Sequence, residues 1–454
     1  MTPKPHRNGM SGWLGRRTTR LRSLVVVGTA TLGLAGLGLA AAGPAAADPA
    51  VSYVLNGSDT TQDVMNGFAA AVSLGILGSY DAVNPVTATP HEIITPAKAL
   101  GGGTFSSCSY TRPNGSTEGY NALEASVFPT TTQPQLAAPP QANCIDIGRS
   151  SSGPGSISNT AGTPGSLDTT GNLIYVPFGV DGVTGATGPT TAGQTTTTKC
   201  VATTTGCTNV VNGIGTITFT VPVTNIAQAD MFTLANLQTL YSCASVTVNG
   251  VTYNPNTAGA GEQQIDLYIP QSGSGTLKFW AKALNFSTST LPACLKQTIA
   301  AGPANGVQVE EHDGSAYASD PNGYGPFSIA QFVAQTNGHN DRRHTAILHN
   351  VNGVAPLVSG ALNPNFVAQL LREVYNVIRY DHAVDNTSPN FDPVLNGLFV
   401  SGTLGGGTTV SRLCTSTFTI KSFGFGTLPN PSLPDTCGAF GNQLRVQETN
   451  SGPS

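Results

Sequence analysis

The sequence predicts an α/β fold, because strand-like and helix-like patterns alternate along most of the chain. Apolar runs at 51–55, 173–180 and 265–269 are typical of buried strands. Several such runs are followed by apolar residues at the three- and four-residue spacing of helices. Three of the expected helices begin directly after a polar turn that contains glycine. We therefore expect strand, turn and helix to recur as one unit.

The first 47 residues predict an export signal. Arginines between 16 and 22 precede an apolar run over 24–42, and Ala47 before Asp48 offers a cleavage site. The general secretory route and the twin-arginine route fit about equally. No cysteine precedes Cys108, which argues against a lipid-anchored N-terminus. We expect a secreted protein, extracellular or periplasmic, without a membrane anchor.

Charge limits the partners. The signal segment holds six of the 20 Lys and Arg and none of the 24 Asp and Glu, which leaves the other 407 residues 14 basic and 24 acidic groups, a net charge of −10. This balance disfavours nucleic acid and anionic membrane as partners. We expect a monomer that binds no cofactor.

Eight cysteines, all after the signal, fit an oxidising environment. They allow about 105 pairings. Neighbours in the sequence suggest four disulfides: Cys108–Cys144, Cys200–Cys207, Cys243–Cys294 and Cys414–Cys437. No CxxC pair occurs, so a metal site is not expected.

The N-terminal half predicts the first elements in order. After the strand at 51–55, Val64 and Phe68 recur at helical spacing, and Asp59 with Gln62 is typical of a capping box at the helix start. A strand at 144–148 and the buried strand at 173–180 follow.

The Thr/Gly-rich segment 184–208 predicts an exposed insertion closed by its two cysteines. A strand at 216–223 and a helix at 233–241 follow it. The strand at 265–269 leads into a helix that starts near Leu277. We also expect an amphipathic helix over 366–380.

The polar turns at 56–61, 112–117 and 271–276 stand directly before expected helices. A helix start has unpaired N–H groups and the positive end of the macrodipole. Three starts that face one point would bind an anion without lysine. Taken singly, each could be an ordinary turn.

In this order, six segments resemble the phosphate-binding subunits of ABC importers, in the class II periplasmic-binding-protein superfamily. They are GSDTTQD (57–63), RPNGSTEG (112–119), CIDIGRSSS (144–152), YVPFGVDGVT (175–184), FTLANLQTLY (232–241) and IPQSGSGTLKFW (269–280). The resemblance implies two α/β lobes, joined by a hinge, that close on an oxyanion. Lobe I would hold 48–178 and 328–454, and lobe II 179–327.

Position by position, the resemblance implies a set of ligand contacts: Thr60, Thr61, Ser116, Ser151, Ser274, Gly275 and Thr276. Pro270 replaces an arginine of the family pattern, and Ser151 replaces an aspartate that accepts a ligand proton. Both departures weigh against monohydrogen phosphate as the ligand. We expect Arg149 either to supply the missing cation or to form a strand-end salt bridge.

Acidic residues and histidines between 310 and 349 are open to another reading, as a metal or acid/base set. The histidine spacing gives no common helical face, so scattered surface residues are the expectation for Glu310, Glu311, His312, Asp313, His339, Asp341, His344 and His349.

The sequence therefore predicts a non-catalytic, secreted solute-binding protein that binds a small oxyanion, with an ABC permease as partner. An extracellular structural or adhesive protein that keeps the fold without tight ligand binding is the alternative. A secreted phosphohydrolase has less support, because no nucleophile–base pair can be assembled.

Overall fold

The computed structural model describes residues 51–72, 76–84, 90–100, 104–127, 138, 140, 142–154, 172–191, 195–404 and 407–446. The expected export signal lies outside these ranges. In this part of the chain, no helix has the length and apolar character needed to cross a membrane.

One ten-stranded sheet runs through the fold, in the order β16-β15-β17-β8-β21-β7-β1-β2, with β18 and β24 also paired to β8. Its outer strands pair in parallel, as β1 does with β2 and β7, whereas β8 and β21 are antiparallel to each other. The strands are β1 (Tyr53–Gly57), β2 (Leu77–Ser79), β7 (Ile147–Ser150), β8 (Leu173–Thr187), β15 (Asp266–Tyr268), β16 (Leu295–Lys296), β17 (Gly323–Ser328), β18 (Ile347–Leu348), β21 (Leu371–Arg379) and β24 (Arg445–Val446).

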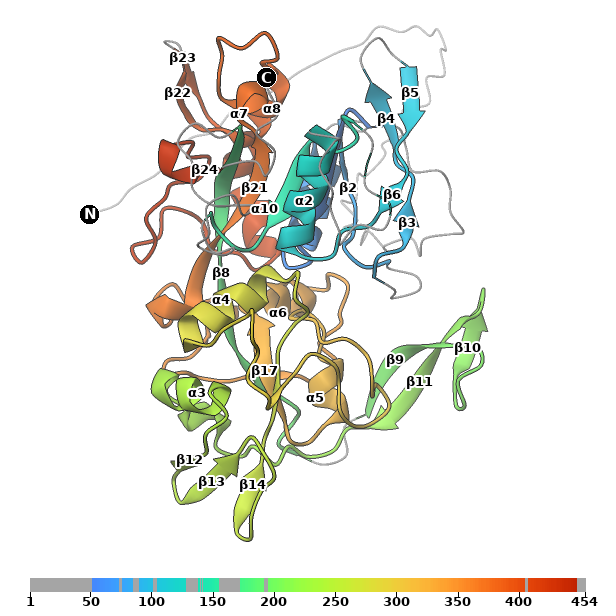
Figure 1. The fold of residues 1–454 in the computed structure, drawn as a ribbon, viewed down its shortest axis with the longest axis vertical. Helices are drawn as coiled ribbons and strands as arrows, with labels where there is room; N and C mark the ends of the chain where they lie inside the picture. Colours follow the sequence, from blue (N-terminus) through green and yellow to red (C-terminus); the bar gives the residue numbers. More distant parts are fainter. Residues whose placement is uncertain are drawn as a thin grey trace, which may run out of the picture. The chain divides into compact units, whose positions relative to one another are not determined.

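Strands β8 and β21 connect two lobes, as Figure 1 shows for β8. All 15 residues of β8 are buried. Along β8, Phe178 belongs to the first hydrophobic core and Val180 to the second; along β21, Leu371 belongs to the second core and Val374 to the first. The predicted two-lobe α/β fold is confirmed, while the exact lobe boundaries stay a prediction.

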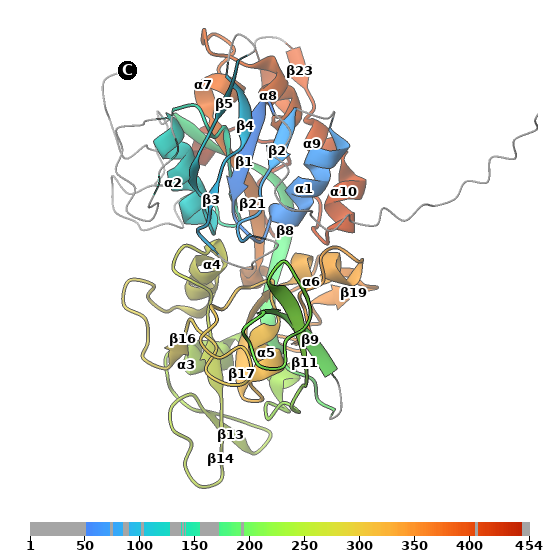
Figure 2. The same cartoon turned by 90° about the vertical axis from the view of Figure 1, so that its right-hand side faces the viewer.

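The first lobe packs helices against β1, β2 and β7 (Figure 2). Its helices are α1 (Gln62–Ala71), α2 (Ser116–Val127), α7 (Tyr380–Ala383), α8 (Pro393–Phe399), α9 (Arg412–Thr415), α10 (Thr417–Ser422) and the 3-10 helix η3 (Asn442–Leu444). Its short strands are β3 (Ile93–Ile94), β4 (Ala97–Leu100), β5 (Thr104–Ser107), β6 (Tyr110–Thr111), β22 (Gly402–Leu404) and β23 (Gly407–Thr409).

The second lobe builds its core around β15, β17 and the second half of β8. Its helices are α3 (Leu234–Tyr241), α4 (Gly275–Leu284), α5 (Ser315–Ser319), α6 (Ile329–Thr336) and the 3-10 helices η1 (Ala229–Met231) and η2 (Ala368–Leu370). Its short strands are β12 (Val246–Val248), β13 (Val251–Asn254), β14 (Glu262–Gln264), β19 (Leu357–Val358) and β20 (Ala361–Leu362).

Two helix starts show how local sequence sets these elements. Ser274 caps α4, because its side chain accepts hydrogen bonds from the N–H groups of Thr276 and Leu277. Thr233 caps α3 in a capping box with Asn236. Both helices lie where the sequence predicts them.

The start of α1 differs from the prediction. Its N-cap is Thr61, which makes no side-chain capping bond, and the Gln62 side chain accepts instead from the N–H of Ala82. The predicted Asp59–Gln62 capping box is therefore wrong. Gln62 is used to hold the chain that follows β2.

The predicted helix over 366–380 is also wrong, because this segment forms η2 and then β21. Residues of β21 pair with β8 on one edge and β7 on the other, and eight of its nine residues are buried. The apolar residues Leu370, Val374 and Val377 fall three and four positions apart, so this segment matches helical spacing by chance. Valine, isoleucine and tyrosine, which favour strands, are the sequence signal that the prediction underweighted.

The Thr/Gly-rich segment begins later than predicted. Residues 184–187 are the buried end of β8, and an antiparallel sheet follows, made of β9 (Thr195–Val201), β10 (Thr208–Val211) and β11 (Ile214–Thr220). All residues of β10 are exposed. The four predicted disulfides are all present, with Cα–Cα distances of 5.5–5.8 Å.

Candidate functional site

The three predicted turns lie together in the fold. Gly57 bridges to Asn114 in a parallel β-bridge, which joins the first turn to the second. The side chain of Gln271 donates to the carbonyl of Asn114 at 2.7 Å, and the N–H of Thr117 donates to the carbonyl of Gly273 at 3.2 Å. The starts of α1, α2 and α4 thus meet across the two lobes.

The Ser116 hydroxyl of the second turn meets the loop after β7. The Ser116 hydroxyl accepts from the N–H of Ser151 at 2.9 Å and lies 3.2 Å from the Ser151 hydroxyl. A Cβ at Gly275 would stand 2.3 Å from Ser116 Oγ. Gly275 therefore lets the start of α4 approach the start of α2 closely.

A carboxylate of the chain itself occupies the meeting point. Glu311 is fully buried and accepts hydrogen bonds from the hydroxyls of Thr60 (2.5 Å) and Thr276 (2.7 Å) on one oxygen. Its other oxygen accepts from Ser274 at 3.1 Å. We call Glu311 and these three hydroxyls the Glu311 site.

Burial raises the pKa of Glu311 to about 7, and the nearby Asp59 carboxylate raises it too. The hydroxyl donors oppose this rise because they stabilise the charged form. The Glu311 site thus combines a buried carboxyl group with hydroxyl donors that come from both lobes.

Arg372 of β21 supplies the cation beside the Glu311 site. Its Nη2 donates to the Thr276 hydroxyl and to Asp181, both at 2.8 Å. Its Nη1 has no hydrogen-bond partner among the described residues. Asp181 also accepts from the Ser328 hydroxyl and from the N–H of Ala330. A buried, bonded ion pair thus borders the site.

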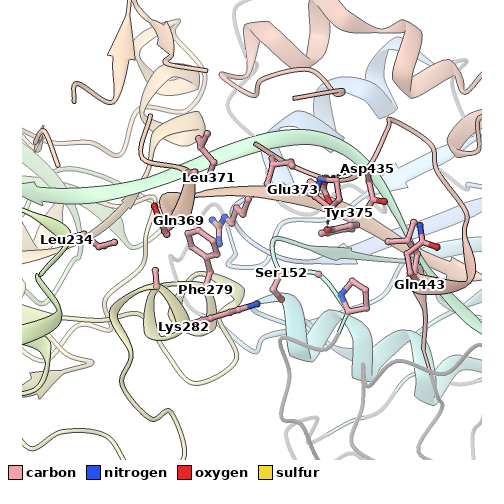
Figure 3. A pocket seen from close by; sticks show the side chains of 18 of the residues that line it. Ser152, Leu234, Phe279, Lys282, Gln369, Leu371, Glu373, Tyr375, Asp435 and Gln443 are labelled. Carbon is pink, nitrogen blue, oxygen red and sulfur yellow. Dashed lines mark hydrogen bonds between the residues drawn. The ribbon is translucent and has the colours of Figure 1, made fainter. Parts of the chain in front are cut away.

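Arg372 also lines a pocket of about 760 Å³ (Figure 3). Its guanidinium lies 5.3 Å from the ring centre of Phe279, which faces the same pocket. Glu373 and Tyr375 form part of the opposite wall, joined by a hydrogen bond of 2.6 Å. The pocket therefore extends to Arg372, the residue that donates a hydrogen bond to Thr276.

Arg149 contacts a different part of the molecule. It is fully buried, and its guanidinium donates to the Ser79 hydroxyl (2.8 Å) and to the carbonyls of Tyr80 (2.6 Å) and Gly57 (3.3 Å). Burial lowers the pKa of Arg149 to about 10. None of these three bonds reaches a hydroxyl of the Glu311 site, so its part in ligand binding stays a prediction.

The residues between 310 and 313 are not scattered surface groups, which corrects the prediction. Glu311 and His312 are buried, and Asp59 and Glu310 lie with His312 so that one ligand atom of each falls within 4.8 Å of the others. We call Asp59, Glu310 and His312 the carboxylate cluster. These residues are buried because the segment before α5 packs against the turn before α1, where Glu311 contacts Thr60 and His312 contacts Asp59.

The remaining residues of that set do not join the cluster. His344 lies 3.4 Å from Asp313, and His349 lies 3.2 Å from Asp230. His339 stacks on Phe423 with ring centres 3.9 Å apart, and Asp341 is exposed. These five residues lie at other places, and the predicted surface position is wrong for His349, which is buried.

The structure places Thr60, Ser116, Ser151, Ser274, Gly275 and Thr276 close together, and their role in ligand binding stays a prediction. Thr61 lies beside them, fully buried, with its hydroxyl unpaired among the described residues. The sequence analysis did not single out Arg372 or Asp181, and it expected Glu311 on the surface. A signal was available for two of them: Arg372 interrupts an apolar strand, and Glu311 stands in a run of four ionisable residues in a chain with only 10% charged residues.

No protein-family model matches the chain, and no curated protein matches it. Among solved structures it is similar to a Clostridium perfringens protein assigned as a phosphate ABC transporter substrate-binding protein, which holds phosphate: 11% identity, TM-score 0.40, covering 82% of this chain and 98% of that one.

Two further structures are similar. One is a protein from Planctomyces limnophilus proposed to bind phosphate (11% identity, TM-score 0.34, 84% of this chain and 95% of that one). The other is a phosphate-binding protein from Stenotrophomonas maltophilia (14% identity, TM-score 0.29, 84% and 92%). Identities and TM-scores this low carry no argument about the ligand of this chain.

Proposed function

We propose that this chain is a secreted solute-binding protein that takes a small oxyanion at the Glu311 site and delivers it to an ABC permease. The observation that carries the proposal is the Glu311 carboxylate itself. Three hydroxyls from two helix starts donate to its oxygens, in the place where the resemblance puts an oxyanion. The carboxylate stands in for the free anion.

The donors suit an anion that needs no proton acceptor. Thr60, Ser274 and Thr276 are hydroxyls that can donate, and Arg372 has an unpaired N–H group beside them. Helix starts add the favourable end of the macrodipole. A fully ionised tetrahedral anion such as sulfate, or a phosphate-like anion, fits this set better than an anion that must donate.

The Glu311 side chain must move away from the three hydroxyls before an external anion can bind to them. Two anions in one buried place repel each other strongly, because the surrounding dielectric is low. Removal of this carboxylate should therefore strengthen anion binding. If Glu311 acted instead as a proton acceptor for monohydrogen phosphate, its removal would weaken phosphate binding and leave sulfate binding unchanged.

Calorimetry with sulfate and phosphate tests the proposal on the mature protein and on Glu311→Ala. We expect Glu311→Ala to bind at least one of the two anions about tenfold to a hundredfold more tightly. Adding Thr276→Ala should remove most of that gain. Asp385→Ala is the control, because this carboxylate bonds only to its own turn and should leave affinity unchanged.

One alternative rests on the same contacts. An extracellular structural or adhesive protein would have no need to release Glu311, and the exposed strands β9–β11 could serve adhesion. In that case neither the wild type nor Glu311→Ala would bind any anion of the panel. This outcome would overturn the solute-binding proposal.

A further inference from the structure

The carboxylate cluster combines two acidic side chains and one imidazole in a small volume. Asp59 comes from the turn before α1, and Glu310 and His312 come from the segment that precedes α5. One oxygen of each acid and one ring nitrogen of His312 lie within 4.8 Å of one another. Among these atoms, His312 Nδ1 lies 3.2 Å from Asp59 Oδ2.

The potential ligand atoms of the cluster have no hydrogen-bond partner among the described residues. They are both oxygens of Asp59, Oε2 of Glu310 and Nδ1 of His312. Asp59 is 0% exposed and His312 is 3% exposed. Buried polar atoms are normally paired, and a buried carboxylate oxygen without a partner is costly. The ion pair between His312 Nδ1 and Asp59 Oδ2 accounts for one of these oxygens, and the others leave the cluster with acceptor atoms in excess.

The surrounding contacts hold the Glu310 side chain and the backbone of His312 and Asp59 in place. Glu310 Oε1 accepts from the Asn114 side chain at 3.0 Å, which leaves Oε2 for the cluster. The Gln335 side chain donates to the carbonyl of His312 at 2.8 Å, and the N–H of Gln62 donates to the carbonyl of Asp59 at 3.2 Å. Fixed partners on the outer side are what a metal site requires of its ligands.

Nearby charges do not neutralise the cluster. Arg149 is the buried cation on the Asp59 side, but its guanidinium bonds to Ser79, Tyr80 and Gly57. Glu311 faces the Thr60 hydroxyl and adds further negative charge. A bound cation would offset this excess.

We propose that Asp59, Glu310 and His312 bind a divalent first-row metal ion, such as Zn²⁺ or Mn²⁺. One imidazole nitrogen with two carboxylate oxygens is a donor set that suits these ions, whereas Mg²⁺ and Ca²⁺ prefer oxygen alone. Three protein ligands leave room for water on the ion. This metal site and the Glu311 site have no residue in common, although Asp59 and Glu310 directly precede Thr60 and Glu311 in the sequence.

The test uses untagged mature protein that has been stripped of metal. We expect it to take up one Zn²⁺ or Mn²⁺ per chain by calorimetry, with a rise in melting temperature. Co²⁺ in place of these ions should give visible absorption bands typical of mixed nitrogen and oxygen ligands. Failure of all three ions to bind would overturn the proposal and leave a shared proton as the occupant of the cluster.

Variants of the cluster identify the ligands. Asp59→Asn, Glu310→Gln and His312→Gln should each weaken metal binding by at least about tenfold. Glu310→Gln keeps the oxygen that accepts from Asn114, so it decides the test if another variant fails to fold. His382→Gln is the control, because this histidine lies in α7, which contributes no ligand atom to the cluster. Equal metal uptake by the control and the cluster variants would also overturn the proposal.

The metal test and the anion test have separate readouts. Sulfate or phosphate binding by Glu311→Ala does not require an ion in the cluster, and metal uptake does not require an anion. Failure of one proposal therefore leaves the other standing.

Discussion

The Glu311 site and the carboxylate cluster lie next to each other and differ in their polar groups: the first is rich in hydrogen-bond donors and the second in acceptors. Thr60 and Glu311 belong to the first, and their neighbours Asp59 and Glu310 belong to the second. The Glu311 site has donors that are matched by a carboxylate of the chain, whereas the cluster has acceptors without partners. Adjacent residues of two segments thus build one place suited to an anion and another suited to a cation.

The largest expected effect comes from the ion pair that borders only the Glu311 site. Arg372→Ala should lower the free energy of unfolding by about 3–5 kcal/mol, because Asp181 would stay buried without its charge partner. Arg372→Lys should recover only part, since an ammonium cannot make the two-point contact with Asp181. Urea unfolding measures both variants.

Arg412→Ala is the matched control for that prediction. Arg412 is exposed on α9, so its loss should change the unfolding free energy by no more than about 0.5 kcal/mol. If Arg372→Ala lowered the unfolding free energy as little as Arg412→Ala does, the ion pair beside the Glu311 site would contribute nothing to stability.

A middle-sized effect should differ between the two neighbouring glutamates. In metal-free protein, Glu311→Ala should lower the unfolding free energy by about 1–3 kcal/mol, because three buried hydroxyls lose their acceptor. Glu310→Ala removes one of two carboxylates that repel each other and should leave stability unchanged or raise it. Thermal and urea unfolding of the two variants, side by side, measure the difference. If Glu310→Ala lowered the unfolding free energy as much as Glu311→Ala, the acceptor atoms of the cluster would already have hydrogen-bond partners in the metal-free protein.

The smallest effect is expected from the exposed sheet of β9–β11. The double variant Cys200→Ser/Cys207→Ser opens a disulfide between residues seven apart, which joins β9 to the turn before the exposed strand β10. Anion and metal affinities should change by less than about twofold, because none of the named ligand atoms lies in this sheet. Calorimetry at both sites checks this, and a tenfold loss at either would place the sheet near the binding residues.

Local signals were enough to predict where these three helices start. The polar turns before α1, α2 and α4 carry serine, threonine and glycine, and Ser274 caps α4, whereas the capping box predicted for α1 does not form. The disulfides followed from order along the chain, as the four observed pairs confirm. The α/β fold followed from the alternation of patterns.

The missed residues depend on contacts between distant segments. Arg372 reaches Thr276 only because β21 is a strand between β7 and β8, and the sequence pattern favoured a helix there. Glu311 reaches Thr60 across 251 positions of sequence, so no local pattern could place it. Arg149 was predicted from its place in a motif, but packing turns its guanidinium toward Ser79 and Tyr80.

The pairing of Arg372 with Asp181 has a mechanical consequence. The two residues are register partners on β21 and β8, close to where each strand passes from one core to the other. The same guanidinium bonds Thr276 at the start of α4. Arg372 thereby connects the ion pair between β8 and β21 to Thr276, which donates to the Glu311 carboxylate. A change in the group that Thr276 binds would therefore alter the contacts of Arg372, at the place where the two strands connect the lobes.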